Sequence, residues 1–279
     1  MELGKVRITF FVAISGSVGY ILSAGEMNAA MILPILGIFI LSVGAAAFNH
    51  YQEIDTDSLM DRTKNRPLPA KKIKDETALL FAVGTSISGL LLLAIFSNPM
   101  ALLLGVMALI SYNIVYTPLK KITAWAIMPG ALVGAIPPAI GWAAAGGSVM
   151  NPQLWVLALF FFIWQIPHFW FLLLIFDKDY QKGGFPTLTE TFSDIQLTRI
   201  SYVWIAALAA TCMLIPLFGV THNLMTNIIL FVAGVAMVYR TGNYIRNYNE
   251  ARSLKLAFLN VNIYVLLVVF LLSVDQFLA

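Results

Sequence analysis

The stretch AAMILPILGIFILSVGAAAF, residues 29–48, carries no charged side chain and is followed at once by a polar segment that begins at Asn49. Twenty consecutive apolar residues suffice for an α-helix to cross the hydrocarbon core of a bilayer. No water is available there to satisfy exposed peptide groups, so spanning segments must be helices or barrel strands, and strands would show ~10-residue alternating patterns. The continuous run therefore predicts a membrane helix. Similar runs occur at about 8–25, 77–96, 100–117, 123–145, 153–176, 200–219, 224–240 and 256–274.

The composition agrees with this reading. Of the 279 residues, 59% are hydrophobic and 11% are charged, whereas a soluble domain carries roughly 25% charged residues. So few ionic groups cannot cover a surface that faces water, so lipid must be the solvent for most of it. The single cysteine, Cys212, excludes a disulfide within the chain. We expect one all-α membrane domain over residues 1–279, a bundle of about nine helices.

The positions of the basic residues predict the topology. All 17 Lys and Arg residues lie in the N-terminus or in the segments 49–76, 118–122, 177–199 and 240–255. With nine spans these segments share one side, which the positive-inside rule places in the cytoplasm, and the C-terminus then lies outside. The net charge of +3 is thus a topology signal, and nucleic acid is not an expected partner. The short N-terminus has neither a cleavage site nor a presequence, which favours the cytoplasmic membrane of a prokaryote.

The segment after the second span predicts a metal and diphosphate site. Asn49, Glu53 and Asp57 follow one another at intervals of four residues, and each such step turns only about 40° around a helix. If the second helix continues, three oxygen donors share one face, as Mg²⁺ requires. Cations suited to phosphate oxygens follow closely: Arg62, Lys64 and Arg66. A solvated topology-setting loop would explain these cations but not the acidic face.

Two further spans contain unusual residues. Tyr116 and Lys120 end the fourth span, where aromatic residues and lysines are also common as interface anchors. In the fifth span, Gly130 and Gly134 permit close helix contact, and the pair Pro137-Pro138 predicts a broken helix that lines an internal cavity.

The sixth span predicts a second functional region. It contains Trp164, Gln165 and His168, and an ionisable residue inside a membrane helix is a functional candidate by default. His168 is either a ligand or proton acceptor, or a histidine satisfied by a neighbouring helix or by Gln165. After this span, Asp179 and Tyr180 lie among lysines at the cytoplasmic end, and Asp179 is favoured over Asp177 as a second carboxylate.

The acidic segment resembles the first aspartate-rich motif of the UbiA-type intramembrane prenyltransferases, Asn-x-x-x-Asp-x-x-x-Asp followed by Arg-Thr-x-x-Arg-Pro. Here Glu53 replaces the first aspartate, which keeps the charge and adds one methylene, and the second part reads RTKNRP at 62–67. Tyr116 and Lys120 resemble the family's Tyr-x-x-x-Lys element.

Three more segments resemble the protohaem IX farnesyltransferase (haem O synthase) branch of that superfamily: IPPAIGW at 136–142, WQIPHFW at 164–170 and KDYQKGGFP at 178–186. The resemblance implies transfer of a farnesyl group from farnesyl diphosphate to a vinyl group of haem b, which is a substrate and not a cofactor. It further implies Mg²⁺ as the divalent metal, an active site at the cytoplasmic face, membrane lipid as surroundings, and a haem A synthase or terminal oxidase assembly proteins as partners.

The resemblance also implies roles for individual residues. Catalysis and metal binding would fall to Asn49, Glu53, Asp57 and Asp179, with Lys120 as a further catalytic residue. Substrate binding would involve Arg62, Lys64, Arg66, Tyr116, Trp164, Gln165, His168 and Tyr180.

Two alternatives remain open from the residues. One is a prenyltransferase that acts on the aromatic ring of a quinone precursor. The other is a secondary transporter with broken helices around a midplane site. The transporter is disfavoured because the charge cluster lies at one face and the acidic motif is not repeated in the second half of the chain.

Overall fold

The computed structural model describes residues 2–246 and 250–278, which form helices and connecting turns without a β-strand. Among these residues, nine helices are long and apolar enough to cross a membrane, which confirms the predicted fold class. The chain divides into two compact units. Unit 1 comprises Met1–Val149 and Lys178–Pro186, and unit 2 comprises Met150–Asp177 and Thr187–Ala279. The expectation of a single domain stays a prediction, and each unit is described by itself.

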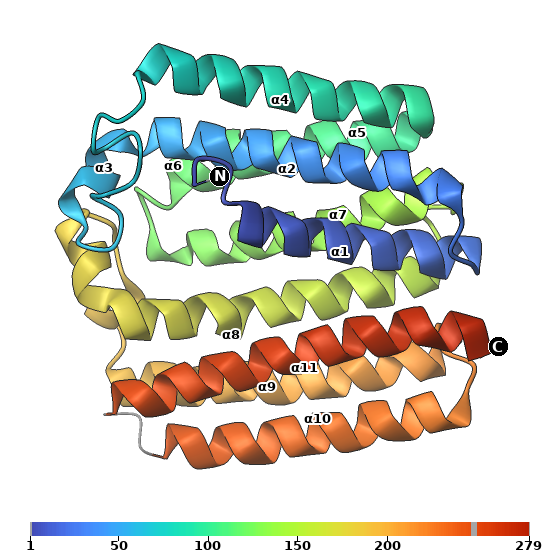
Figure 1. Cartoon of the computed structure of the whole chain (residues 1–279). Helices are drawn as coiled ribbons and strands as arrows, with labels where there is room; N and C mark the ends of the chain where they lie inside the picture. Colours follow the sequence, from blue (N-terminus) through green and yellow to red (C-terminus); the bar gives the residue numbers. More distant parts are fainter. Residues whose placement is uncertain (1, 247–249, 279) are drawn as a thin grey trace. The chain divides into compact units, whose positions relative to one another are not determined.

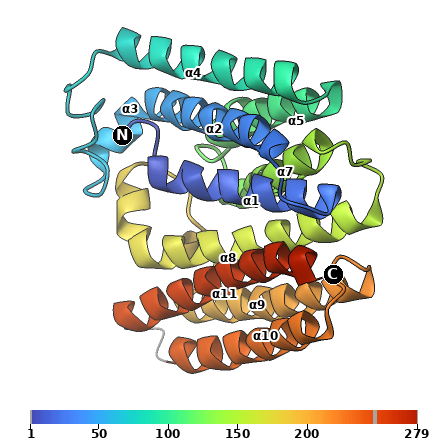
Figure 2. The same cartoon turned by 45° about the vertical axis from the view of Figure 1, so that its right-hand side comes forward.

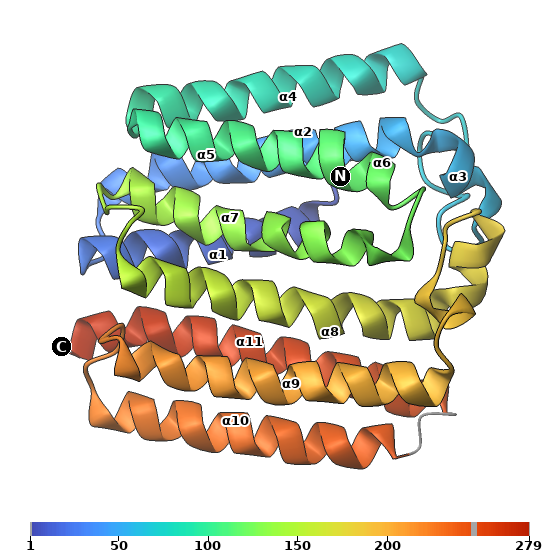
Figure 3. The same ribbon diagram turned by 180° about the vertical axis from the view of Figure 1, so that it is seen from behind.

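Unit 1 is a set of antiparallel helices (Figure 1). Its elements are α1 (Val6–Ala24), α2 (Ile32–Gln52), α3 (Ile54–Leu59), α4 (Asp75–Phe96), α5 (Pro99–Leu109), a π-helical segment (Ile110–Tyr116), α6 (Thr117–Leu119) and α7 (Ile127–Ala144). Helix α2 packs on α4, and α1 packs on both α7 and α2, as Figure 2 shows. The short helices α3 and α6 lie at the same end of this unit, which is also where α1 begins (Figure 3).

Unit 2 contains most of α8 (Pro152–Lys182) together with α9 (Asp194–Leu217), α10 (Leu224–Ile245) and α11 (Ala251–Leu278). Helix α10 packs against both α9 and α11. Asp275, near the end of α11, is fully buried and accepts hydrogen bonds from the backbone N–H groups of His222 and Asn223. These bonds supply the partners that a buried carboxylate requires and fix the turn between α9 and α10.

Several helices extend beyond the apolar runs, mainly where a run adjoins a segment that contains Lys or Arg. Helix α2 continues to Gln52 where 48 was expected, and α9 begins at Asp194 where 200 was expected. Helix α8 reaches Lys182, but a non-helical residue at Phe176 interrupts it at the expected end of the span. Hydropathy marks where lipid ends, whereas a helix continues until its backbone is capped. Ser193, for example, caps the start of α9 with a capping box. Part of the predicted connection 240–255, residues 247–249, lies outside the described residues.

The fifth span is not broken at its prolines. Helix α7 is continuous through Pro137 and Pro138, both of which are buried. A Cβ atom added to Gly141 would lie 1.8 Å from the carbonyl oxygen of Gly16. A Cβ atom added to Gly19 would lie 1.9 Å from the carbonyl oxygen of Pro138. The backbones of α1 and α7 therefore touch at this point, as small residues in membrane helices allow. The prediction of a break here was wrong. Helix α7 stays helical because α1 packs closely against it at the two prolines.

Candidate functional site

The acidic segment forms a helix with one interruption. Helix α2 ends at Gln52, Glu53 has φ −115° and ψ 14°, and α3 begins at Ile54. The backbone N–H of Asp57 still donates to the carbonyl of Glu53 at 2.7 Å. The expected uninterrupted helix was therefore wrong at Glu53. All three predicted donors are nevertheless buried: the exposed fraction is 1% for Asn49, 4% for Glu53 and 1% for Asp57.

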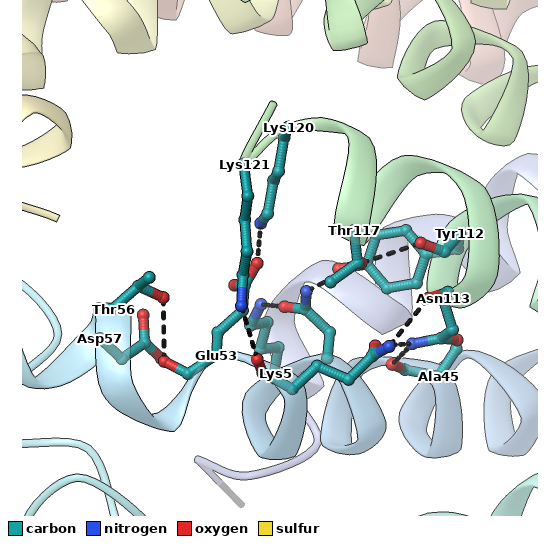
Figure 4. Close-up of polar contacts among 12 residues, drawn as sticks. Lys5, Ala45, Glu53, Thr56, Asp57, Tyr112, Asn113, Thr117, Lys120 and Lys121 are labelled. Atoms are coloured by element: carbon teal, nitrogen blue, oxygen red, sulfur yellow. Dashed lines mark hydrogen bonds and ion pairs between the residues drawn. The ribbon is translucent and has the colours of Figure 1, made fainter. Parts of the chain in front are cut away.

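Each of these three side chains contacts a cation of the chain. Lys120 forms an ion pair with Glu53, and Arg66 Nη1 lies 2.7 Å from Asp57 Oδ2. Lys5 Nζ donates to Asn49 Oδ1 at 2.9 Å. Figure 4 shows Lys5 and Lys120 reaching this cluster from different parts of unit 1. Because buried carboxylates are very costly unless they are paired, these cations allow the acidic groups to be buried.

Lys5 is a member of the site that the sequence did not identify. It lies just before α1, and in the sequence it was counted only among the basic residues that predict the topology. Burial, together with the charges of Arg66 and Lys120, lowers the pKa of the Lys5 ammonium to about 7, although Glu53 and Asp57 oppose this shift. No signal in the sequence distinguishes Lys5 from other lysines beside a span, because its contact with Asn49 depends on how α1 packs on α2.

A buried polar network fixes the orientation of the Asn49 amide. Asn49 Nδ2 donates to Thr117 Oγ1 at 3.1 Å, and this hydroxyl donates to the carbonyl of Tyr112 at 2.8 Å. Gln52 Nε2 donates to the carbonyl of Asn113 at 2.9 Å. Tyr112 and Asn113 lie in the π-helical segment, a rare geometry that often occurs at functional sites. The network leaves Asn49 Oδ1 on the side of Lys5.

Tyr116 and Lys120 lie close together. Lys120 Nζ is 5.4 Å from the centroid of the Tyr116 ring and 5.5 Å from that of Phe185. Tyr116 stacks on Tyr112 with centroids 5.9 Å apart. A Cβ atom on Gly130 would lie 2.6 Å from Tyr116 Cε2, so this glycine makes room for the aromatic ring beside Lys120.

Asp179 connects the segment after α8 to the loop after α3. Its carboxylate accepts from the backbone N–H groups of Asp61 at 3.2 Å and Arg62 at 3.0 Å. The Arg62 guanidinium lies 5.8 Å from the centroid of the Tyr180 ring. Residues 177–182 were expected to be a connection, but they are helical, and a non-helical residue at Phe176 separates them from the rest of α8. The metal-binding role of Asp179 stays a prediction.

Lys64 pairs with a different carboxylate from those at 53 and 57. Lys64 Nζ is 2.6 Å from Asp61 Oδ1, and Lys182 pairs with the other oxygen of Asp61. Hydrogen bonds from Lys182 and Lys64 lower the pKa of the Asp61 carboxyl to about 2. All three side chains are exposed, so these contacts lie at the surface and not in the buried cluster. The predicted contact of Lys64 with substrate stays a prediction.

The buried cluster has the chemistry of a site for one hard cation. Asp57 Oδ1 is buried and has no hydrogen-bond partner within the described part of the chain. No group of three or more His, Cys, Asp and Glu side chains gathers as a metal site in the same residues. Two carboxylates and an amide oxygen match Mg²⁺, which takes few protein ligands and completes its shell with water and phosphate oxygens. The donor set therefore fits a metal that is bound together with its substrate.

The second predicted region lies in unit 2. His168 is half-buried on α8, and its Nδ1 lies 2.8 Å from Oδ1 of Asn262 on α11. A neighbouring helix thus supplies the partner, and Gln165, which was the expected candidate, does not. The Trp164 ring lies 5.2 Å from the His168 ring, centroid to centroid, and Gln165 is half-buried on the same helix. Asn262 was missed, although a polar side chain inside the last span is itself a signal of function.

Nine helices among the described residues are long and apolar enough to cross a membrane, and unit 1 buries carboxylates against cations, so the chain is an integral membrane protein with a buried polar site. The chain belongs to the UbiA prenyltransferase family, whose model matches residues 11–262. The resemblance noted in the acidic motif is thereby confirmed.

Curated relatives place it more narrowly within this family. The chain is 32% identical over 275 residues to the protoheme IX farnesyltransferase of Oleidesulfovibrio alaskensis, covering 99% of this chain and 95% of the relative. It is 37% identical over 219 residues to the enzyme of the same name from Geobacter sulfurreducens, covering 78% and 81%. The relative of that name from Christiangramia forsetii is 34% identical, with 99% and 93% covered.

Solved structures share the fold. A digeranylgeranylglyceryl phosphate synthase superposes with a TM-score of 0.78 at 18% identity, covering 99% of this chain and 96% of the other. A UbiA homologue from Archaeoglobus fulgidus, bound to DMAPP and Mg²⁺, has a TM-score of 0.74 at 14% identity, with 100% and 99% covered. The chain is therefore a multi-pass membrane protein with the UbiA fold.

Proposed function

We propose that this chain transfers the farnesyl group of farnesyl diphosphate to a vinyl group of protohaem IX. Diphosphate leaves, water adds to the carbocation that forms on the haem side chain, and a proton is released, giving haem O. The observation that carries the proposal is the buried cluster in which Asn49, Glu53 and Asp57 each meet a cation of the chain. Relatives named protoheme IX farnesyltransferase, similar over nearly the whole chain, support protohaem as the acceptor over the ring of a quinone precursor. They also favour an enzyme over a transporter.

Asn49, Glu53 and Asp57 would hold a divalent metal, for which we propose Mg²⁺. Bound there, the ion would neutralise charge on the diphosphate and so make it a better leaving group. The unpartnered Oδ1 of Asp57 supports this assignment, because a buried carboxylate oxygen without a donor is otherwise costly. Asp179 remains a further candidate ligand.

The cations of the cluster would bind the phosphate oxygens. Lys5 donates to the amide oxygen of Asn49, and Lys120 pairs with the carboxylate of Glu53. Once those oxygens are engaged by a ligand, the two ammonium groups would pair with the diphosphate together with Arg66, and would stabilise the charge that develops as it leaves. Arg62, Lys64, Tyr116 and Tyr180 would complete the binding surface, and the loop after α3 would be held by Asp179.

Loss of the diphosphate leaves an allylic carbocation that water would quench. The apolar helices of the membrane region would exclude water and bind the farnesyl tail, where each buried CH₂ contributes about 0.8 kcal/mol. Haem would be held in unit 2, with His168 as a ligand of its iron and with Trp164 and Gln165 beside it. We further propose that the segments containing Lys and Arg face the cytoplasm of a prokaryotic cell. Haem A synthase or oxidase assembly proteins would receive the product.

The test is a reconstitution of the full chain in proteoliposomes. Farnesyl diphosphate, haem b and Mg²⁺ are supplied, and the haem fraction is extracted and analysed by mass spectrometry. A haem that carries a hydroxyethylfarnesyl group is the expected product. A parallel reaction contains 4-hydroxybenzoate as a quinone-precursor ring. A prenylated benzoate without any farnesylated haem would overturn the proposal.

A further inference from the structure

His168 and Asn262 form a polar contact between two helices of unit 2. His168 Nδ1 and Asn262 Oδ1 are 2.8 Å apart, and both side chains are half-buried. The two residues come from α8 and α11, which are separated by 94 positions in the sequence. A hydrogen bond between membrane helices restrains the side chains at both of its ends.

The amide of Asn262 can be oriented from its second contact. Asn262 Nδ2 donates to the carbonyl of Phe258 at 2.6 Å, one turn earlier on α11. The flipped amide would place two acceptor oxygens against each other at that position, so only one orientation makes both bonds. Oδ1 must therefore face His168.

This orientation decides which nitrogen of His168 carries the proton. An amide oxygen only accepts hydrogen bonds, so the ring must donate through Nδ1–H. In a neutral imidazole the other nitrogen, Nε2, then has a free lone pair. The tautomer is the one that a histidine needs in order to bind a metal through Nε2.

Aromatic neighbours restrain the plane of the ring. The Phe258 ring lies 4.9 Å from the His168 ring at an interplanar angle of 45°, and the Trp164 ring lies 5.2 Å away at 63°. These two residues lie on the same two helices as the hydrogen bond. Tautomer and ring orientation are therefore both set before any ligand binds.

We propose that Asn262 is a positioning residue that holds His168 as the Nδ1–H tautomer so that its Nε2 binds the iron of haem. The inference rests on the proposed function, because it takes haem as the ligand. Metal-binding histidines generally donate their other N–H to such a partner, and loss of the partner typically costs 10–100-fold in metal affinity or activity. Asn262 would bind no substrate itself and would act through His168.

The experiment measures haem binding rather than turnover. Ferric haem b is titrated into the full chain in nanodiscs, and the absorbance spectrum gives both the dissociation constant and the axial ligand. Wild type should show an imidazole-ligated spectrum, and His168→Ala should lose it. Asn262→Leu should weaken haem binding by about 10–100-fold, whereas Asn262→Asp, which keeps an acceptor for Nδ1–H, should retain the wild-type spectrum.

Asn260 provides a matched control on the same helix. Its Nδ2 donates to the carbonyl of Met237 and to Thr241 Oγ1, both on α10. Asn260→Leu removes an amide of the same size from α11 without touching His168, so its haem spectrum should stay that of wild type. Equal loss of haem binding in Asn260→Leu and Asn262→Leu would overturn the positioning role, because disturbance of α11 alone would then explain both.

Two further outcomes separate this inference from the proposed function. An unchanged spectrum and affinity in Asn262→Leu, in a wild type that still makes farnesylated haem, would overturn the inference alone. A wild type that binds haem through His168 but makes no farnesylated haem from farnesyl diphosphate would overturn the proposed function and leave the inference supported.

Discussion

The acidic cluster of unit 1 and the His168 region of unit 2 solve the problem of burying polar groups in different ways. In the first, the buried carboxylates pair with Arg66 and Lys120, and Lys5 donates to the amide oxygen of Asn49 beside them. In the second, one neutral hydrogen bond joins His168 to Asn262 among aromatic rings. Paired charges can be exchanged for an anionic substrate, whereas a neutral imidazole suits a flat apolar ligand with a metal at its centre.

The difference predicts that the two regions can be inactivated separately. Each of the following predictions alters one region and uses the other as its reference.

The largest effect is expected for Asp57→Asn. The change removes a buried negative charge that pairs with Arg66 and that would hold the metal. We expect product formation to fall on the order of 10³-fold, at the upper end of what single charge-stabilising groups contribute to catalysis. Haem binding, measured by absorbance, should stay unchanged. The result is interpreted against the amount of folded protein in the membrane, and full turnover with excess Mg²⁺ would contradict the metal role.

His168→Leu should show the opposite pattern. Loss of an iron ligand should weaken haem binding by at least about 100-fold, which is the upper end of the range expected for loss of a partner such as Asn262. Binding of magnesium pyrophosphate, followed by calorimetry, should match wild type because no part of the acidic cluster is altered. Weakened pyrophosphate binding in this variant would show that the two regions are coupled.

Lys120 and Lys121 offer a test within the acidic region. Lys120 pairs with the buried Glu53, whereas Lys121 Nζ donates to the backbone carbonyl of Gln52 at 2.9 Å. Lys120→Gln should lower kcat/KM for farnesyl diphosphate by about tenfold, which corresponds to ~1.4 kcal/mol. Lys121→Gln should stay within about twofold of wild type. Similar losses in both variants would mean that only the total positive charge matters.

Lys182→Gln should have the smallest effect. Lys182 pairs with Asp61, both are exposed, and Asp61 keeps Lys64 as a second partner. Exposed ion pairs usually contribute little because water screens them. The midpoint of unfolding, measured in detergent with denaturant, should therefore stay close to that of wild type. A clear drop in the midpoint would show that the contacts of Asp61 contribute to stability despite their exposure.

Much of the acidic site could be predicted because its information is local. Asn49, Glu53 and Asp57 are spaced at helical intervals, and all three are buried as one group despite the interruption at Glu53. The interruption itself could not be predicted, since no glycine or proline marks it. The Pro137-Pro138 pair shows the reverse error, because the local signal for a break was overridden by the packing of α1 on α7.

By itself the sequence determined that lipid is the solvent, that about nine helices cross it and that Asn49, Glu53 and Asp57 recur at helical intervals just before several cations. Hydropathy, helical period and charge counts express these features over neighbouring residues, so no knowledge of packing was needed. Only the tertiary structure decided which groups meet: Lys5 with Asn49 across 44 positions, and His168 with Asn262 across 94. Such pairs depend on how one helix packs against another. The residues next to Lys5 or Asn262 in the sequence therefore do not indicate which side chain each of them contacts.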